Sequence, residues 1–362
     1  MPLEPLLFLN FNQADSGRIG DEPLSPEYVL ACRFLHCSII DRTSALEPGF
    51  SCSVLDPIPE STSNQESFAQ LCDAVGDEIV AQADRESRTI SLLWSGGIDS
   101  TAALVAIIKA AEARRCTELM QVRLSMHSAT EYPGFFLRFI NDRIAFAPVS
   151  HPISACLRAC DINVTGEHGD QLFGSHLLAP YVRRGLGGAP YQDVLPFVLH
   201  DRLGSWRSAR RVQRFLAPVI AAAPVRIATL FDYFWWLNFS LKWQEVTLRL
   251  PALRGGHAAE IYQSIHHFYR DERFQMWALA NTPGKAVPGW DRYKDEAKRY
   301  ILDFTGDRAY FQYKEKEDSL RHVMAGRDIS TKTLAFMRQD FQPIYSSVEW
   351  KPSWLISRFF RQ

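Results

Sequence analysis

The sequence has no paired cysteine spacing and no long apolar segment. Its seven cysteines are an odd number without a CxxC pair, so neither a disulfide framework nor a zinc knuckle is expected. We expect Cys156 and Cys160 to be small buried hydrophobic residues. The longest apolar run, residues 215–225, contains two prolines and is about half the length that a bilayer requires. The N-terminus lacks the basic region of a signal peptide, so we expect a cytoplasmic protein without a membrane partner.

An excess of one charge is also missing. Lys and Arg total 40 against 41 for Asp and Glu, which argues against a protein that binds nucleic acid through overall charge. The one basic stretch, residues 182–226, is expected to be a solvated helical surface, with a docking face for an acidic partner as the alternative. The 362 residues, 46% of them hydrophobic, suffice for one large domain or two ordinary ones.

The first 60 residues differ in character from those that follow. They contain seven prolines and no long hydrophobic period, so we expect short strands and turns there. Ser63 and Glu66 form a capping box that predicts the start of a helix. That helix would place on one apolar face Phe68, Leu71, Cys72, Val75 and Ile79. We therefore predict a short N-terminal segment over 1–60 and a larger domain over 61–362.

The next part of the chain has the pattern of a parallel sheet. Residues 89–94 are apolar and β-prone, residues 95–100 (SGGIDS) form a tight turn, and residues 101–115 are Ala-rich and predict a helix. Further strands are expected at 119–124 and 161–165. Strand, helix and strand within about 35 residues indicate a βαβ unit, and hence an α/β fold with a parallel sheet. The C-terminal half is expected to be largely helical, with the aromatic block from 231 to 237 in its core.

The turn after the first predicted strand has the composition of a phosphate-binding loop. Gly96 and Gly97 let the backbone approach a ligand, and the amides that begin the following helix favour an anion. Ser95 and Ser100 add hydroxyl donors. Asp99 can lie beside a phosphate only with a cation between them, normally Mg²⁺. We therefore expect a magnesium-bound phosphate or pyrophosphate, and the alternative is an ordinary strand–helix turn.

Two segments carry a resemblance to a known family. SGGIDS resembles the pyrophosphate loop of the N-type ATP pyrophosphatases, which split ATP into AMP and pyrophosphate. Residues 164–174 (VTGEHGDQLFG) resemble the SGEGxDELFGG segment of the asparagine synthetase C-terminal domain, which β-lactam synthetases and related amide formers share. The resemblance implies a parallel-sheet domain of the adenine nucleotide α-hydrolase-like (PP-loop) kind with a largely helical C-terminal half.

The resemblance also implies roles for individual residues. It makes Asp99 and Asp170 ligands of Mg²⁺, and it lets the strand after the first helix bind adenine through its backbone. His168 replaces a small residue of the second motif, and we favour a solvated loop histidine over a contact with phosphate or substrate. The ATP-binding positions that the resemblance implies are Ser95, Gly96, Gly97, Asp99, Ser100, Val122, Leu124, Met126, Gly166, Glu167 and Gly169.

The catalytic residues are less clear in the sequence. Residues 313–319 (YKEKEDS) resemble the family's late lysine loop, with Lys316 as the first choice for the catalytic lysine and Lys314 as the second. The alternative is a solvated charged surface. The family's Glu-x-Arg-x-Pro-Phe element has no clean match. Residues 246–251 resemble it with Thr247 in place of the glutamate, and residues 265–269 resemble only its end. Weak candidates for the acid are Glu245 and Glu260.

The function implied by the resemblance is an ATP-dependent ligase that forms amide bonds. It would adenylate a small-molecule or peptide carboxylate, release pyrophosphate, and transfer the acyl group to an amine or ammonia. Residues 40–49 resemble the end of the family's glutaminase domain, but Pro2 stands in place of its cysteine nucleophile. The nitrogen must then come from a substrate amine, free ammonia or a separate partner subunit. We expect residues 22–60 to pack on the sheet.

Two alternatives to the ligase remain open. One is an RNA-modifying pyrophosphatase of the lysidine or thiolation kind, against which the absence of paired cysteines and of a basic domain argues. The other is a relative that binds a nucleotide without catalysis. The intact loop motifs argue against this second alternative, whereas the missing glutamate argues for it.

Overall fold

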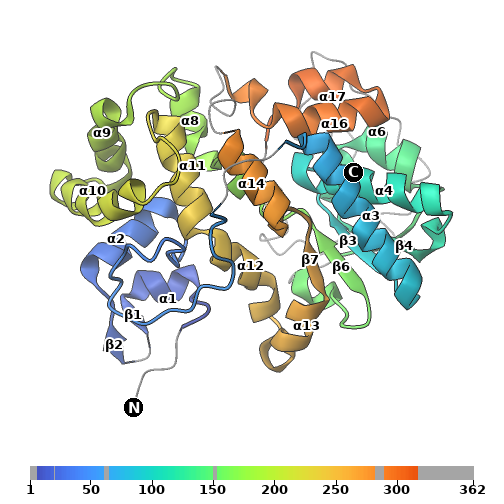
Figure 1. Ribbon diagram of the computed structural model, residues 1–362, viewed down its shortest axis with the longest axis horizontal. Helices are drawn as coiled ribbons and strands as arrows, with labels where there is room; N and C mark the ends of the chain where they lie inside the picture. The colour runs from blue at the N-terminus through green and yellow to red at the C-terminus, as the bar shows by residue number, and fades with distance from the viewer. Residues whose placement is uncertain (1–5, 20, 61–64, 150–152, 282–288, 317–362) are drawn as a thin grey trace, which may run out of the picture. The chain divides into compact units, whose positions relative to one another are not determined.

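The computed structural model describes residues 6–19, 21–60, 65–149, 153–281 and 289–316 (Figure 1). They divide into two compact units, each assembled from three separate stretches of chain. We call the first the helical unit, from Met1–Gln65, His168–Arg249 and Glu272–Arg292. The second is the sheet unit, from Glu66–Glu167, Leu250–Asp271 and Tyr293–Gln362. The described residues up to Glu60 are thus part of the helical unit.

The sheet unit is built on a five-stranded, all-parallel sheet, which confirms the α/β prediction. The strand order is β5-β4-β3-β6-β7, with the central strand β3 ending at the glycine loop. Three strands lie close to the predicted positions, and β5 and β7 were not predicted. The strands are β3 (Ile90–Trp94), β4 (Met120–Leu124), β5 (Ala145–Pro148), β6 (Ile162–Thr165) and β7 (Ile265–His267).

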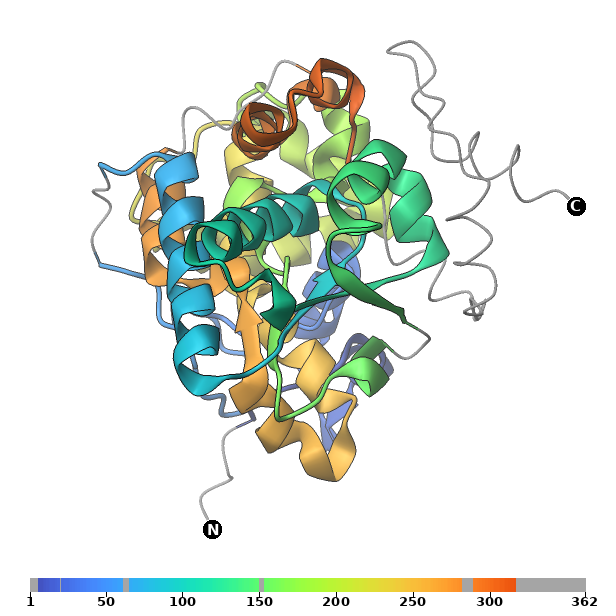
Figure 2. The same ribbon diagram turned by 90° about the vertical axis from the view of Figure 1, so that its right-hand side faces the viewer.

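Two long helices of this unit, α3 (Phe68–Glu86) and α4 (Ile98–Arg114), lie side by side (Figure 2). A Cβ on Gly76 would lie 2.9 Å from the carbonyl of Ala106, so this glycine permits the close approach of α3 to α4. The capping box of α3 is made by Ser67 and Gln70, and Ser63 lies outside the described residues. The other helices of the unit are α5 (Met126–Glu131), α6 (Pro133–Phe135), α13 (Ala258–Ser264), α16 (Asp295–Thr305) and α17 (Arg308–Tyr313).

The helical unit has α11 (Leu230–Leu241) at its centre, and every residue of this helix is buried. The aromatic block at 231–237 is therefore core, as predicted. Within the described residues, no helix is long and apolar enough to cross a membrane. The unit also contains α1 (Phe11–Ser16), β1 (Arg18–Ile19), β2 (Glu22–Pro23), α2 (Pro26–Leu35), α7 (Gly169–Phe173), α8 (Ala179–Val182), α9 (Tyr191–Leu203), α10 (Trp206–Ala221), α14 (Glu272–Ala280) and most of α12 (Trp243–Ala252).

The N-terminal segment contains more regular structure than its prolines suggested. The expectation of only strands and turns is wrong, because α2 is a ten-residue helix. Pro26 occupies the first turn, where its missing N–H costs no hydrogen bond, and the Ser25 hydroxyl accepts a bond from the backbone N–H of Tyr28. The helix packs on α9 and α10.

Arg42 anchors the rest of this segment to α11. Its guanidinium is buried and donates to the carbonyl oxygens of Asp56, Pro57 and Phe239. Its backbone N–H donates to the carbonyl of Ser240. These contacts join the segment to a helix of its own unit, whereas packing on the sheet was expected.

The cysteines are all free, as expected from their spacing. Most are buried, and Cys156 is partly buried. The expectation of burial is wrong for Cys160, which is exposed next to the start of β6.

Candidate functional site

The glycine loop joins the end of β3 to the start of α4. The helix begins at Ile98, earlier than the predicted Thr101, so Asp99 and Ser100 lie in its first turn. The hydroxyl oxygens of Ser95 and Ser100 are 2.9 Å apart, and the backbone N–H of Gly97 donates to the Ser95 hydroxyl. The loop therefore gathers two hydroxyls, backbone amides and the positive end of a 17-residue helix, a combination that favours an anion.

Two glycines are required by the packing around this loop. Gly96 has a φ of +82°, and a Cβ there would lie 2.4 Å from the carbonyl oxygen of Ser128 and 2.8 Å from the Cβ of Glu131. A Cβ on Gly166 would lie 2.7 Å from the backbone nitrogen of Ser100. The start of the second motif thus contacts the first turn of α4, and the loop contacts α5.

Gly96→Ala is expected to lower the free energy of unfolding, because alanine resists the left-handed conformation by about 1–2 kcal/mol and its Cβ meets a carbonyl oxygen. If the loop binds ATP, as the motif predicts, the variant should also lose that binding. Thermal unfolding and equilibrium binding of ATP measure the two effects. The control is Gly188→Ala, where a Cβ would meet nothing within 4 Å. Equal stability of the two variants would contradict this account of the loop.

Lys294 forms an ion pair with the loop aspartate. Its side chain is fully buried, and its ammonium contacts Oδ2 of Asp99, whose side chain is 19% exposed. The Tyr269 hydroxyl donates to the backbone carbonyl of Asp99 over 3.0 Å. Burial raises the pKa of Tyr269 well above its ordinary value, so this phenol stays a donor. No sequence pattern indicated a role for Lys294, which lies in an ordinary charged stretch just before α16.

A second buried ion pair lies beside the loop. The ammonium of Lys314 is 2.8 Å from Oε1 of Glu131, and their side chains are 0% and 8% exposed. Glu131 ends α5 and contacts Gly96, as described above. Lys316 is only partly buried. The geometry thus favours Lys314, the second choice from the sequence, over Lys316; residues 317–319 of the predicted lysine loop lie outside the described residues.

The predicted adenine-binding strand is β4, in the interior of the sheet. Val122 lies beside Leu92 of β3 and Phe146 of β5, and Leu124 lies beside Trp94 and Pro148. The backbone of β4 is thus engaged with strands on both sides. Met126 starts α5 beyond the carboxyl end of β4, where ligands of parallel sheets usually bind. Leu124 ends β4 and Met126 begins α5, so these two of the three predicted positions lie at this edge, whereas Val122 lies within the strand.

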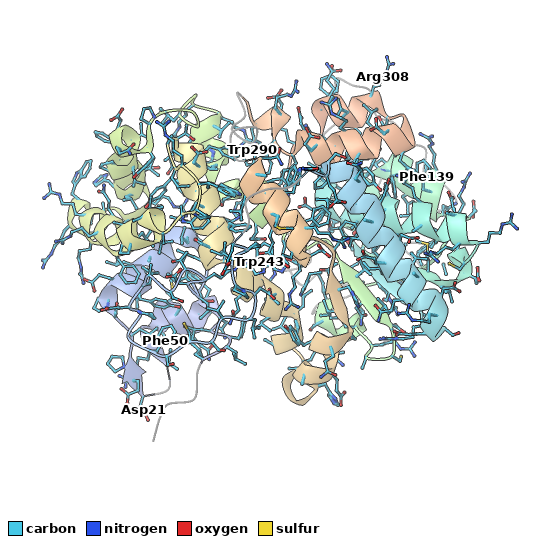
Figure 3. The ribbon with its side chains drawn as sticks, in the orientation of Figure 1. Asp21, Phe50, Phe139, Trp243, Trp290 and Arg308 are labelled. Atoms are coloured by element: carbon cyan, nitrogen blue, oxygen red, sulfur yellow. The ribbon has the colours of Figure 1, made fainter. Side chains whose placement is uncertain are left out.

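The second motif continues in the helical unit, where α7 carries Asp170. His168 precedes α7 and is buried, with its ring stacked 4.3 Å from that of Trp243 (labelled in Figure 3) and its Nε2 3.2 Å from the hydroxyl of Thr247. The expectation of a solvated histidine is therefore wrong. Thr247, which the sequence resemblance placed at the position of a glutamate, lies on helix α12 and bonds this histidine.

Helix α11 holds α7 in place. The side-chain amide of Asn238 donates to the carbonyl oxygens of Asp170 and Gly174, over 2.8 and 2.6 Å. The indole N–H of Trp235 donates to the carbonyl of Leu172 over 3.0 Å. The aromatic core of the helical unit therefore also supports the segment that carries Gly169 and Asp170.

The predicted magnesium ligands belong to different units, Asp99 to the sheet unit and Asp170 to the helical unit. Among the described residues, no three or more His, Cys, Asp or Glu side chains form a group that could hold a metal ion. Carboxylate oxygens suit Mg²⁺, and Asp99 could bind the ion only by sharing its carboxylate with Lys294 or by releasing that lysine. Magnesium therefore stays a prediction.

Glu245 and Glu260, the candidates for the glutamate that has no clean match in the sequence, differ in their surroundings. Glu260 is exposed and pairs with His257 at 3.3 Å, as a surface residue does. Glu245 lies on α12 of the helical unit. Glu131, which the sequence did not indicate, is buried, with its Cβ against the loop and its carboxylate on the ammonium of Lys314.

The arrangement in the sheet unit can bind an anion and place two lysines near it. Gly166 and Glu167 follow β6, the neighbour of β3, so they lie at the same edge of the sheet as the loop. No protein-family model, curated protein or solved structure matches this chain.

Proposed function

We propose that the protein is an ATP-dependent ligase that forms amide bonds, with a sheet unit of the PP-loop kind and a site similar to that of asparagine synthetase. The observation that carries the proposal is the loop of residues 95–100. The loop lies at the carboxyl end of the central parallel strand. Its Gly96 contacts α5, and Gly166 of the second motif packs against the first turn of α4. Two buried lysines pair with carboxylates here, Lys294 with Asp99 of the loop and Lys314 with Glu131 beside it.

The proposed reaction has two steps. An oxygen of the substrate carboxylate attacks the α-phosphorus of ATP, the bond to pyrophosphate breaks, and an acyl-adenylate forms. The nitrogen of an amine or ammonia then attacks the acyl carbon, the carbon–oxygen bond to AMP breaks, and a proton leaves the nitrogen. The carboxylate belongs to a small molecule or a peptide, and the nitrogen comes from a substrate amine, ammonia or a partner subunit.

The chain's own residues would hold the pyrophosphate in position and stabilise the negative charge that develops during the reaction. The amides at the start of α4 and the hydroxyls of Ser95 and Ser100 would hold the pyrophosphate oxygens. Lys314 would stabilise negative charge that develops as the adenylate forms or is consumed. Mg²⁺, when bound, supplies positive charge against the phosphates, and the ligands that the sequence resemblance implies for it are Asp99 and Asp170.

The test is exchange of labelled pyrophosphate into ATP, with Mg²⁺ and a panel of amino acids, other small carboxylic acids and peptides. We expect exchange that depends on one class of acid, and no protein-dependent release of ammonia from ¹⁵N-amide glutamine. ATP binding without exchange for any acid would indicate a non-catalytic relative. Formation of AMP that requires added RNA would indicate an RNA-modifying enzyme. Either result would overturn the ligase.

A further inference from the structure

We propose that Glu131 is a positioning residue that fixes Lys314 beside the glycine loop, and this inference rests on the proposed function. The carboxylate of Glu131 is 2.8 Å from the ammonium of Lys314. A lysine side chain has a flexible stem of four carbons and a strongly hydrated charge, so a buried ammonium needs a partner to hold it in one place. Glu131 supplies that partner from a segment 183 residues away in sequence.

Glu131 is itself held against the loop. It ends α5, whose first turn is closed by a capping box between Ser125 and Ser128. The carbonyl of Ser128 and the Cβ of Glu131 are the nearest atoms to a Cβ built on Gly96. The position of the carboxylate is therefore tied to the position of the loop, and through the ion pair the ammonium is tied to it as well.

The same short segment also holds the helix that precedes the lysine. The ring of Tyr132, the neighbour of Glu131, stacks 4.0 Å from that of Tyr310 on α17. The Tyr132 hydroxyl donates to Asp307, whose other carboxylate oxygen accepts from the backbone N–H of Tyr310. The backbone N–H of Lys314 donates to the Tyr310 carbonyl. Residues 131 and 132 thus position both the backbone and the side chain of the lysine segment.

This placement defines what Glu131 contributes. A donor that is already aimed at the site where charge develops stabilises a transition state without reorganisation. Glu131 would give Lys314 that fixed direction, and it would keep the ammonium paired until an anionic ligand arrives. Its effect on turnover should therefore require Lys314, and it should leave the affinity for ATP almost unchanged.

The experiment is a double-mutant cycle with Glu131→Gln and Lys314→Gln in the full chain, followed by pyrophosphate exchange. We expect Glu131→Gln to lower kcat by about 10–100-fold with the KM for ATP within about 3-fold, since one misplaced donor costs less than a lost one. In the Lys314→Gln background the same change should cost less than about 2-fold. Glu131→Asp should recover part of the rate, and the surface change Glu118→Gln should have no effect.

Hydrogen exchange of the backbone amides over residues 308–316 tests the placement without any assay of activity. We expect faster exchange there in Glu131→Gln than in the wild type or Glu118→Gln. If the wild type shows no acid-dependent pyrophosphate exchange, the proposed function fails, whereas the amide protection still decides whether Glu131 positions this segment. Unchanged protection, a wild-type kcat in Glu131→Gln, or additive losses in the cycle would each overturn the proposal.

Discussion

Lys314→Ala is expected to lower the rate of acid-dependent pyrophosphate exchange by about 10²–10³-fold, the usual effect of removing one preorganised donor. Its ammonium is buried and paired with Glu131, a residue whose Cβ lies against the loop. Lys316→Ala should retain a rate close to that of the wild type, because Lys316 is only partly buried two residues further on. The measurement is kcat for exchange in both variants.

This comparison needs a stability control. Lys314→Ala leaves the carboxylate of Glu131 buried without its cation, which lowers stability by itself. The double variant Lys314→Ala with Glu131→Gln removes both charges and should unfold at a higher temperature than the single variant, while exchange remains lost. A reversed order, with Lys316→Ala inactive and Lys314→Ala active, would show that the first choice from the sequence was right.

The second large effect concerns the loop aspartate. Asp99→Asn should abolish pyrophosphate release, and it should also lower the free energy of unfolding by about 3–5 kcal/mol, because it removes a negative charge that contacts the buried ammonium of Lys294. The motif alone suggests that this change leaves the fold intact, and the ion pair with Lys294 contradicts that expectation. Urea unfolding at equilibrium measures the loss.

The matched variants separate stability from activity. Asp99→Asn combined with Lys294→Met removes both charges and should recover most of the stability without recovering exchange. Asp77→Asn breaks an exposed pair with Arg114 and should cost no more than about 1 kcal/mol. Full stability of Asp99→Asn would show that the pair with Lys294 contributes nothing, and wild-type exchange in that variant would refute the metal assignment.

The elements around the loop could be predicted because their signals are local. β3 is an apolar run of five residues, and α4 follows the glycines directly. The start of α4 was misplaced because Asp99 and Ser100 were assigned to the turn, although both residue types are common in a first helical turn. Pro26 was counted among the seven prolines of a segment expected to hold short strands and turns, whereas it occupies the position where proline begins a helix.

The partners of the site residues could not be predicted. Asp99 and Lys294 are 195 residues apart, and Glu131 and Lys314 are 183 apart. Hydrophobic periodicity describes which face of an element is buried and carries no information about which charges meet. The burial of His168 likewise depends on the ring of Trp243, which no local pattern around the motif indicates.

The division of each unit into three stretches of chain has a consequence for synthesis on the ribosome. At about 5–20 residues per second, Asp99 leaves the ribosome about 10–40 s before Lys294. The strands β3, β4 and β6 therefore emerge well before β7, which completes one edge of the sheet. During that interval the nascent chain exposes an apolar strand edge, which is the kind of surface that chaperones bind. Slow elongation after β6 would prolong this exposure.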